Sequence, residues 1–251
     1  MSIDLLISLA CGLLGAVLAS FAGVISERLH TGESWVAGRS RCNSCNRTLS
    51  SHDLVPVLSW LVSRGRCFSC RAPVPFRYAL SELVLAIVFY ATAARMGVSP
   101  SLGILLFSFF ILAIVVLYDM RHTIVPMSLS LLLVLTSLAY AVISMSAVTG
   151  LSIVLMSAGS IGLAFFLMHA LSGGRWMGLG DAPIALALSL IVGKGALVGL
   201  LFSFWIGGVI GVFILVLTPR GHRMGIEVPF VPFLAAGYLL AFFTQWNPFL
   251  F

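Results

Sequence analysis

The chain contains 251 residues, of which 60% are hydrophobic and only 9% are charged. Its mean hydropathy of +1.12 lies well outside the range of soluble globular domains, so the composition excludes a water-soluble enzyme or binding module and predicts a polytopic membrane protein. The formal net charge of +6 would suit a nucleic-acid partner, but the positions of the basic residues explain it better as a signal of membrane topology.

Apolar runs predict the transmembrane helices. A helix needs roughly 20 residues to cross a hydrocarbon core about 30 Å thick. Because the sixth run is short, the sequence predicts an all-α protein with seven to eight transmembrane helices. We expect three parts: a first transmembrane helix in 1–26, a cytoplasmic cysteine-rich loop in 27–77 and a transmembrane core in 78–251. The runs lie at 3–25, 78–94, 102–118, 124–143, 151–171, 181–192, 196–217 and 231–246.

The first run carries Asp4 in place of the basic residues that begin a secretory signal, so we expect it to be retained as a span and the mature protein to begin at or close to Met1. Eight of the fourteen Lys and Arg residues fall in 27–77. If this loop is cytoplasmic and there are eight spans, the loops of Arg121, Arg175, Arg220 and Arg223 are cytoplasmic too, and only Arg95 and Lys194 lie outside. Both termini are then expected outside.

Two C-x-x-C pairs stand out in the first loop, Cys42 with Cys45 and Cys67 with Cys70. Four thiolates in this spacing predict a tetrahedral, structural Zn²⁺ site that holds together a short polar segment with little core of its own. Redox dithiols or unrelated thiols are the alternative. Four sulfur ligands leave no position for water, which disfavours a catalytic zinc. Cys11, in the first run, is expected to be a small buried apolar residue.

Two aspartates border apolar runs: Asp119 ends the third and Asp181 begins the sixth. A carboxylate at the centre of a bilayer costs roughly 2.5–3.5 kcal/mol, so acids in this setting suggest function. By parity both lie on the cytoplasmic side, where folding can bring them face to face. Two confined carboxylates retain one proton between them, which supplies an acid and a base for hydrolysing an amide. The alternative makes Asp181 a helix cap and Asp119 an end charge.

Two glycines before Asp181 and two polar residues within the apolar runs carry further expectations. Gly178 and Gly180 lack side chains and are expected to let an extended substrate backbone approach Asp181. Glu82, in the second run, is expected to pair with an arginine or a polar helix face. His169, in the fifth run, is expected to find its partner on a neighbouring helix.

Several segments in this order resemble one family, the type IV prepilin peptidases, which are bacterial membrane aspartyl proteases of the G-x-G-D class. The resemblance covers most of the chain. It rests on "ASFAGVISERLHTGES", the cysteine quartet around "VPVLSWLVSRGRC", and then "PFRYALSELVLA", "DMRHTIVP", "GLGDAPIALAL" and "EVPFVPFLAAG".

The resemblance implies an endopeptidase that cleaves the leader of type IV prepilins or type II secretion pseudopilins at the cytoplasmic face of the bacterial inner membrane. It carries the catalytic role onto Asp119 and Asp181 and the metal role onto the four loop cysteines. Members with this loop often also methylate the new N-terminal amine with S-adenosylmethionine, which would make the loop the methyltransferase part. The implied partners are the substrate pilins and the lipid bilayer, with no nucleic acid.

The chain departs from the family pattern at three positions. Pro183 stands where the family usually has lysine, and Ala22 and Gly23 stand where larger or polar residues are common, with Glu27 and Arg28 remaining as candidate polar groups. Pro183 motivates a second hypothesis, a membrane scaffold or assembly factor of the same fold with impaired catalysis. A proton-coupled transporter is disfavoured because both acids lie near one face and not at the midplane.

Overall fold

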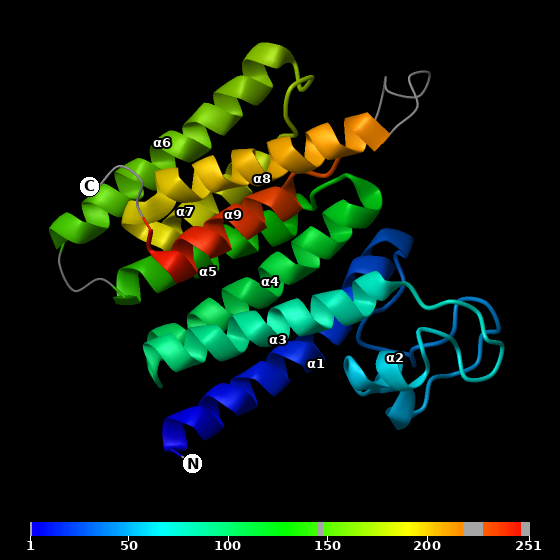
Figure 1. Cartoon of the computed structure of the whole chain (residues 1–251). Helices are drawn as coiled ribbons and strands as arrows, with labels where there is room; N and C mark the ends of the chain where they lie inside the picture. Colours follow the sequence, from blue (N-terminus) through cyan, green and yellow to red (C-terminus); the bar gives the residue numbers. More distant parts are fainter. Residues whose placement is uncertain (1, 145–147, 218–227, 247–251) are drawn as a thin grey trace. The chain divides into compact units, whose positions relative to one another are not determined.

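A computed structural model describes residues 2–144, 148–217 and 228–246 (Figure 1). The described residues form nine α-helices and two short 3₁₀ turns, η1 and η2, and contain no β-strand. This confirms the predicted all-α class. The helices are α1 (Ile3–Thr31), α2 (Leu58–Val62), α3 (Phe76–Met96), α4 (Pro100–His122), α5 (Met127–Ser144), α6 (Val148–Ser172), α7 (Asp181–Val192), α8 (Ala196–Leu217) and α9 (Val231–Thr244), with η1 at Ser51–Leu54 and η2 at Gly193–Gly195.

Each of the eight predicted apolar runs lies on a helix. By length and composition six stretches are able to cross a membrane, with α7 and α8 counted as the single stretch Asp181–Leu217, while α9 is a shorter apolar helix. The chain is therefore a multi-pass membrane protein. The count of eight spans and the orientation stay predictions. Two of the arginines in the orientation argument, Arg220 and Arg223, lie outside the described residues.

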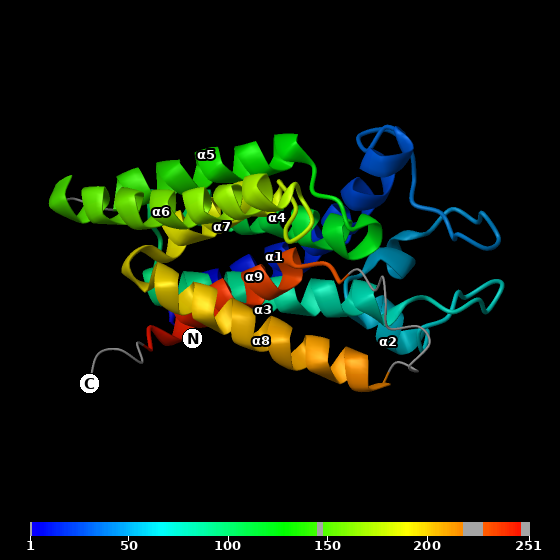
Figure 2. The same ribbon diagram turned by 90° about the horizontal axis from the view of Figure 1, so that it is seen from above.

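Compact packing divides the chain into Met1–Leu117 and Tyr118–Phe251, and the boundary falls inside α4. In the first unit α1 and α3 run side by side (Figures 1 and 2). A Cβ on Gly15 would lie 2.7 Å from the carbonyl oxygen of Leu85, so only glycine permits this approach. The buried seam of α1 continues in small residues on both sides of Gly15, namely Ser8, Gly12, Ala19, Ala22, Gly23 and Ser26.

In the second unit the short helix α7 is the central element. It packs against α5, α6, α8 and α9, and nine of its twelve residues are buried. A helix surrounded by protein does not have to match the bilayer thickness, which explains how a run too short to span is accommodated.

Close contact between α8 and α9 completes this unit. A Cβ on Gly237 would overlap the backbone of Ser203, and a Cβ on Gly199 would lie 2.8 Å from the ring of Tyr238. The Tyr238 hydroxyl lies 2.9 Å from the Ser189 hydroxyl of α7. This buried hydrogen bond satisfies both groups away from water and ties α9 to α7.

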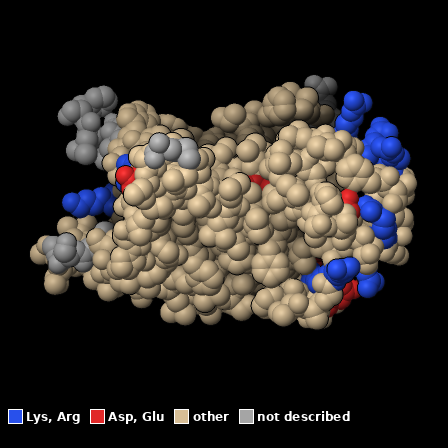
Figure 3. All heavy atoms as spheres, turned by 90° about the horizontal axis from the view of Figure 1, so that it is seen from below, with Lys and Arg blue, Asp and Glu red and all other residues tan. Residues whose placement is uncertain are grey.

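Most of the surface seen in Figure 3 is uncharged, as expected for helices that face lipid. Charged side chains gather in clusters and leave broad uncharged surfaces between them. Large hydrophobic residues accordingly stay exposed along the helices; Leu13 of α1, for example, is 72% exposed.

Candidate functional site

The two cysteine pairs form two copies of one backbone turn. In the first, the N–H of Cys42 donates to the carbonyl of Arg47, and in the second the N–H of Cys67 donates to that of Ala72, each over 2.9 Å. The residue after each pair, Asn46 or Arg71, has a left-handed backbone with φ of 55° or 59°. The sequences RCNSCNRT and RCFSCRAP thus fold as a local repeat.

The repeat brings all four sulfur atoms within 4.8 Å of one another, and the Sγ atoms of Cys42 and Cys70 lie 3.8 Å apart. Four sulfurs bound tetrahedrally at about 2.3 Å from zinc lie about 3.8 Å from one another, so the donor set fits this ion. Backbone N–H groups of Cys70 and Ser69 lower the pKa of Cys67 to about 6. Those of Cys45 and Ser44 lower the pKa of Cys42. The predicted convergence of the four cysteines is confirmed. The backbone donors favour the thiolates of Cys42 and Cys67. A backbone donor from Ala72 also acts on Cys70, but desolvation and the neighbouring sulfurs outweigh it and raise the pKa of Cys70 to about 11.

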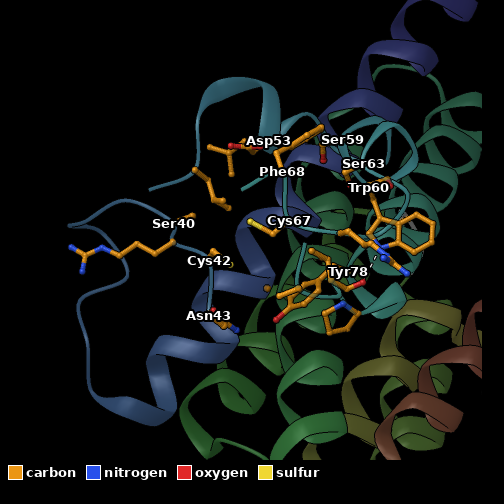
Figure 4. A pocket seen from close by; sticks show the side chains of 18 of the residues that line it. Ser40, Cys42, Asn43, Asp53, Ser59, Trp60, Ser63, Cys67, Phe68 and Tyr78 are labelled. Atoms are coloured by element: carbon orange, nitrogen blue, oxygen red, sulfur yellow. Dashed lines mark hydrogen bonds between the residues drawn. The ribbon is translucent and has the colours of Figure 1, made fainter. Parts of the chain in front are cut away.

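Beside the knuckles, the loop and the helices α1 and α3 enclose a cavity of about 240 Å³ (Figure 4). Its wall combines aromatic rings with a buried carboxylate, and it reaches from Cys42 and Cys67 to the helix seam. Gly23 lines it, and a Cβ there would lie 3.8 Å from the Tyr78 ring, in ordinary contact. Other residues on its wall are Ser20, Trp60, Phe68 and Glu82.

Glu82 anchors the loop to α3. Its Oε2 accepts the N–H of Val57 over 2.7 Å, so its partner is a backbone group of the loop and not the expected arginine or polar helix face. Val57 has φ 61° and ψ −50°, and Leu58 donates to the carbonyl of Pro56 across it over 2.6 Å. This is a γ-turn that a β-branched residue adopts only under strain. The buried carboxylate helps to offset that strain, and the turn begins α2, which carries Trp60 to the cavity wall.

Two arginines of the loop are held by structural contacts. Arg28, a candidate polar group in the sequence, donates to the carbonyls of Ser34, Ala37 and Arg39 over 3.0–3.2 Å and so shapes the turn that follows α1. Arg47 pairs with Asp53 at 2.8 Å.

The environment of Asp53 favours its ionised form. Desolvation acts to raise the pKa of Asp53, but hydrogen bonds from the N–H and hydroxyl of Ser50 and from Arg47 outweigh it and hold the pKa below its usual range. The folded loop therefore stabilises the carboxylate of Asp53 and the charge pair on the cavity wall.

Asp119 lies near the end of α4 with only 4% of its surface exposed. Its Oδ2 accepts the N–H of Val231 over 3.2 Å. Val231 is the first residue of α9, whose opening N–H groups have no partner within the helix. The N-terminus of α9 therefore supplies both a donor and a favourable dipole to this carboxylate.

Asp181 is the first residue of α7 and is 7% exposed. Its Oδ2 accepts the N–H of Gly178 over 3.2 Å, so the carboxylate turns back toward the preceding loop instead of capping the helix. A Cβ on Gly180 would lie 2.5 Å from Cβ of Val125, so the space left by this glycine is filled by the chain that follows α4. Gly178 has more room, because its Cβ position lies 3.4 Å from Oδ2 of Asp181.

The fold brings the two predicted acids together. Asp119 and Asp181 belong to the same compact unit, and their carboxylates are close enough for a Coulombic interaction. Gly180 and Val125 hold the two chain segments against each other beside them. Two buried carboxylates, each with a backbone donor and each within the other's field, can share one proton and work as an acid and a base.

Comparison with protein families gives two matches. Residues 13–96 match the model of the bacterial peptidase A24 N-terminal domain, and residues 104–216 match the model of the type IV leader peptidase family. The chain belongs to the type IV leader peptidase family. The first match covers the four cysteines and the cavity, and the second covers Asp119 and Asp181.

Three curated relatives of this chain are named prepilin leader peptidase/N-methyltransferase. That of Myxococcus xanthus is 32% identical over 82% of this chain and 63% of its own length. That of Aeromonas hydrophila is 32% identical over 80% and 70%, and that of Bacillus subtilis is 30% identical over 91% and 90%. The chain thus spans just under two thirds of the Myxococcus protein. No solved structure matches it.

Two contacts beside the acids could not be predicted from the sequence. The N–H of Val231 reaches Asp119 from 112 positions away, and the only available signal was Pro232, which suits the first turn of a helix. His169 does not bond a neighbouring helix. Its Nδ1 lies 2.9 Å from the carbonyl oxygen of Met177, in the loop that leads to Asp181.

Proposed function

We propose that this chain is an aspartate-pair endopeptidase that removes the leader of type IV prepilins or type II secretion pseudopilins. The observation that carries the proposal is the burial of Asp119 and Asp181 together, each with one backbone N–H donor. The ionised carboxylate takes a proton from water, which attacks the scissile carbonyl. The protonated carboxyl then delivers its proton to the leaving amine, so the pair returns to its starting state after each cycle.

The loop around the acids has a structural part in this proposal. Gly180 is required for the contact with Val125, and the N–H of Gly178 orients Asp181. Pro183 is the third residue of α7, in the first turn, where the missing N–H costs no helical hydrogen bond. The helix is therefore compatible with proline in place of lysine.

We further propose that the loop 27–77, together with the helices α1 and α3 that carry it, performs N-methylation. Three relatives have this activity in their names, and the cavity offers a place for it. Zn²⁺ bound by Cys42, Cys45, Cys67 and Cys70 would hold the knuckles that form one wall. S-adenosylmethionine would supply an electrophilic methyl group. Its sulfonium is a cation, and aromatic rings and a carboxylate suit the binding of a cation.

The chain's own residues have defined parts in methylation. Glu82, which is 9% exposed, faces a cavity that would receive both a sulfonium donor and the new N-terminal amine. The rings of Tyr78 and Trp60 line the same space (Figure 4). The amine must lose a proton to act as a nucleophile, and a buried carboxylate is a suitable acceptor.

We place the protein in the bacterial inner membrane, with both sites toward the cytoplasm. The basic loop supports this orientation. In this arrangement a membrane-anchored pilin presents its leader to the acids from the cytoplasmic side, and the new N-terminus is then methylated on the same side.

The first test is cleavage by the purified wild-type protein in detergent of a prepilin with a glycine–phenylalanine leader junction, analysed by mass spectrometry. Release of the leader in one cut, followed by a gain of one methyl group when S-adenosylmethionine is added, is the expected result. A wild-type protein that binds the prepilin and leaves it intact would favour the scaffold hypothesis that Pro183 motivates.

A further inference from the structure

An exposed apolar face lies on the cysteine loop, outside the long helices. It is formed by residues of η1, of α2 and of the three-residue segment between them, and five of its large side chains are 42–74% exposed. The face lies within residues 54–62, and two arginines, Arg64 and Arg66, follow it in the sequence. Its members are Leu54, Val55, Leu58, Leu61 and Val62.

The depth of this face in the membrane follows from the hydrogen bond that attaches it to α3. Val57, which directly precedes α2, donates to the carboxylate of Glu82. Glu82 is six residues beyond Phe76, the start of α3, and so lies about 9 Å along the helix axis. The first turn of α3 already belongs to an apolar stretch long enough to span the bilayer.

Helix α1, which packs against α3, indicates the same depth in the membrane. Gly23 of α1 lies opposite Tyr78, and Gly15 lies opposite Leu85 and Phe89, so the two helices are antiparallel. The apolar part of α1 ends at Ile25, before Ser26 and Glu27. The hydrocarbon boundary therefore passes close to the first turn of α3, and Glu82 and the start of α2 lie on the membrane side of it.

We propose that α2 is a re-entrant interfacial helix whose exposed apolar face contacts the acyl chains of the leaflet on the loop's side. The arginines that follow it, Arg64 and Arg66, are both exposed and meet the anionic headgroups, the usual arrangement at this level of a bilayer. The face thereby continues the lipid-facing surface of α1 and α3. A consequence, which rests on the proposed function, is that the cavity opens at the bilayer surface, level with the N-terminus of a membrane-anchored pilin.

A photoactivatable amino acid at Leu61, in protein reconstituted into nanodiscs of phosphatidylethanolamine and phosphatidylglycerol, tests this contact. Ser69, an exposed residue of the second knuckle, is the control position. We expect lipid adducts at position 61 in several-fold excess over position 69, detected by mass spectrometry of protein that retains its bound metal. Equal yields at the two positions, or adducts at 61 to a second copy or to residues 118–251, would overturn the proposal. Neither result depends on enzymatic activity.

A second inference concerns one peptide group beside Asp181. The carbonyl of Met177 and the N–H of Gly178 belong to the same peptide unit. The N–H donates to Asp181, and the carbonyl contacts Nδ1 of His169. Because a carbonyl only accepts, Nδ1 carries the hydrogen in this contact. The ring also packs on Gly174, whose Cβ position lies 3.2 Å from Cε1 of His169.

We infer that His169 is a positioning residue for Asp181, acting through this peptide. A donor on the carbonyl fixes the plane of the peptide and polarises it, which strengthens the hydrogen bond that its N–H makes to the carboxylate. Without the imidazole the peptide can rotate and the N–H no longer points at Asp181. The role rests on the proposed function, because it acts on the acid pair.

Three substitutions separate this role from general packing. Asparagine places an amide donor where Nδ1 lies, glutamine places it where Nε2 lies, and leucine supplies none. We expect His169→Leu and His169→Gln to lower kcat for leader cleavage by roughly 10- to 100-fold with little change in KM, and His169→Asn to retain most activity. Equal loss in all three variants, or full activity of His169→Leu, would overturn the inference.

Hydrogen–deuterium exchange at residues 177–181 tests the same inference without catalysis. The Gly178 amide should exchange faster in His169→Leu than in the wild type or in His169→Asn. An unchanged rate in His169→Leu would contradict it. If the wild type does not cleave a prepilin but the exchange differs as expected, the proposed function fails and the positioning role stands.

Discussion

The two units build their polar sites in opposite ways. In the first unit each half of the cysteine cluster is a local turn closed by hydrogen bonds between residues five positions apart, such as Cys42 and Arg47. In the second unit the acid site takes its parts from α4, from the loop before α7 and from the start of α9. The cluster depends on two local turns that bring four sulfur atoms together, whereas the acid pair depends on how α7 and α9 pack.

This difference predicts which changes stay confined to one site. A site built from local turns should lose its function without disturbing the distant helices. A site built by packing should respond to changes in the helix seams that do not touch a carboxylate. The following experiments test the distinction, beginning with the largest expected effect.

Replacing either acid should remove the proton that the pair shares. We expect Asp119→Asn and Asp181→Asn each to lower leader cleavage by roughly 10²- to 10⁴-fold, while methylation of an already cleaved pilin peptide continues. Asp4→Asn, an acid in the first turn of α1, is the matched control. Rates of both reactions in detergent give the comparison, and residual cleavage near the wild-type rate in either acid variant would exclude the dyad.

Replacing one of the four loop cysteines should affect methyl transfer and not leader cleavage. We expect Cys67→Ser to lose the single bound zinc measured by elemental analysis and, with it, most methyl transfer, because the knuckles form a wall of the cavity. Leader cleavage should change by no more than a few-fold. Ser69→Ala is the control, since the N–H that it gives to Cys67 belongs to the backbone. Equal losses of both activities would show that the two units are not independent.

The same contrast explains what could be predicted from the sequence. The C-x-x-C spacing encodes the knuckles almost completely, because each is a local turn. Asp119 and Asp181 could be singled out as acids bordering apolar runs, but Val231 and Val125 could not, since they reach the site only through packing. Gly180 was expected to make room for substrate, whereas Val125 occupies the space beside it. The surroundings of α7 likewise depend on tertiary contacts.

Disturbing the seam between α8 and α9 should weaken cleavage without touching an acid. A Cβ on Gly237 would overlap the Ser203 backbone, so we expect Gly237→Ala to cost about 1–3 kcal/mol of stability. Because α9 also carries Val231, cleavage should fall and methylation should not. Gly211→Ala in α8, with nothing within 4 Å of the new methyl group, should be neutral or gain up to about 1 kcal/mol. Thermal unfolding in detergent and the two rates distinguish these outcomes, and equal effects of both substitutions would contradict the packing argument.

The smallest effect concerns the ion pair on the cavity wall. The folded loop holds the pKa of Asp53 below its usual range, so ionised Asp53 stabilises the loop above the pKa of the unfolded chain, about 3.9, and this contribution is lost as the pH falls through the lower folded value. Asp53→Asn should therefore lower the free energy of unfolding near pH 6 by at most about 1 kcal/mol, because water screens the pair. The unfolding temperature should fall slightly in consequence. The difference between variant and wild type should shrink as the pH falls below about 3.9 and vanish only below the folded pKa of Asp53. Protonation of the cysteines affects both proteins alike and cancels in that difference, and Glu33→Gln, an exposed acid of the same loop, should follow the wild type. A difference that stays constant over this pH range would mean that Asp53 contributes through its shape and not through its charge.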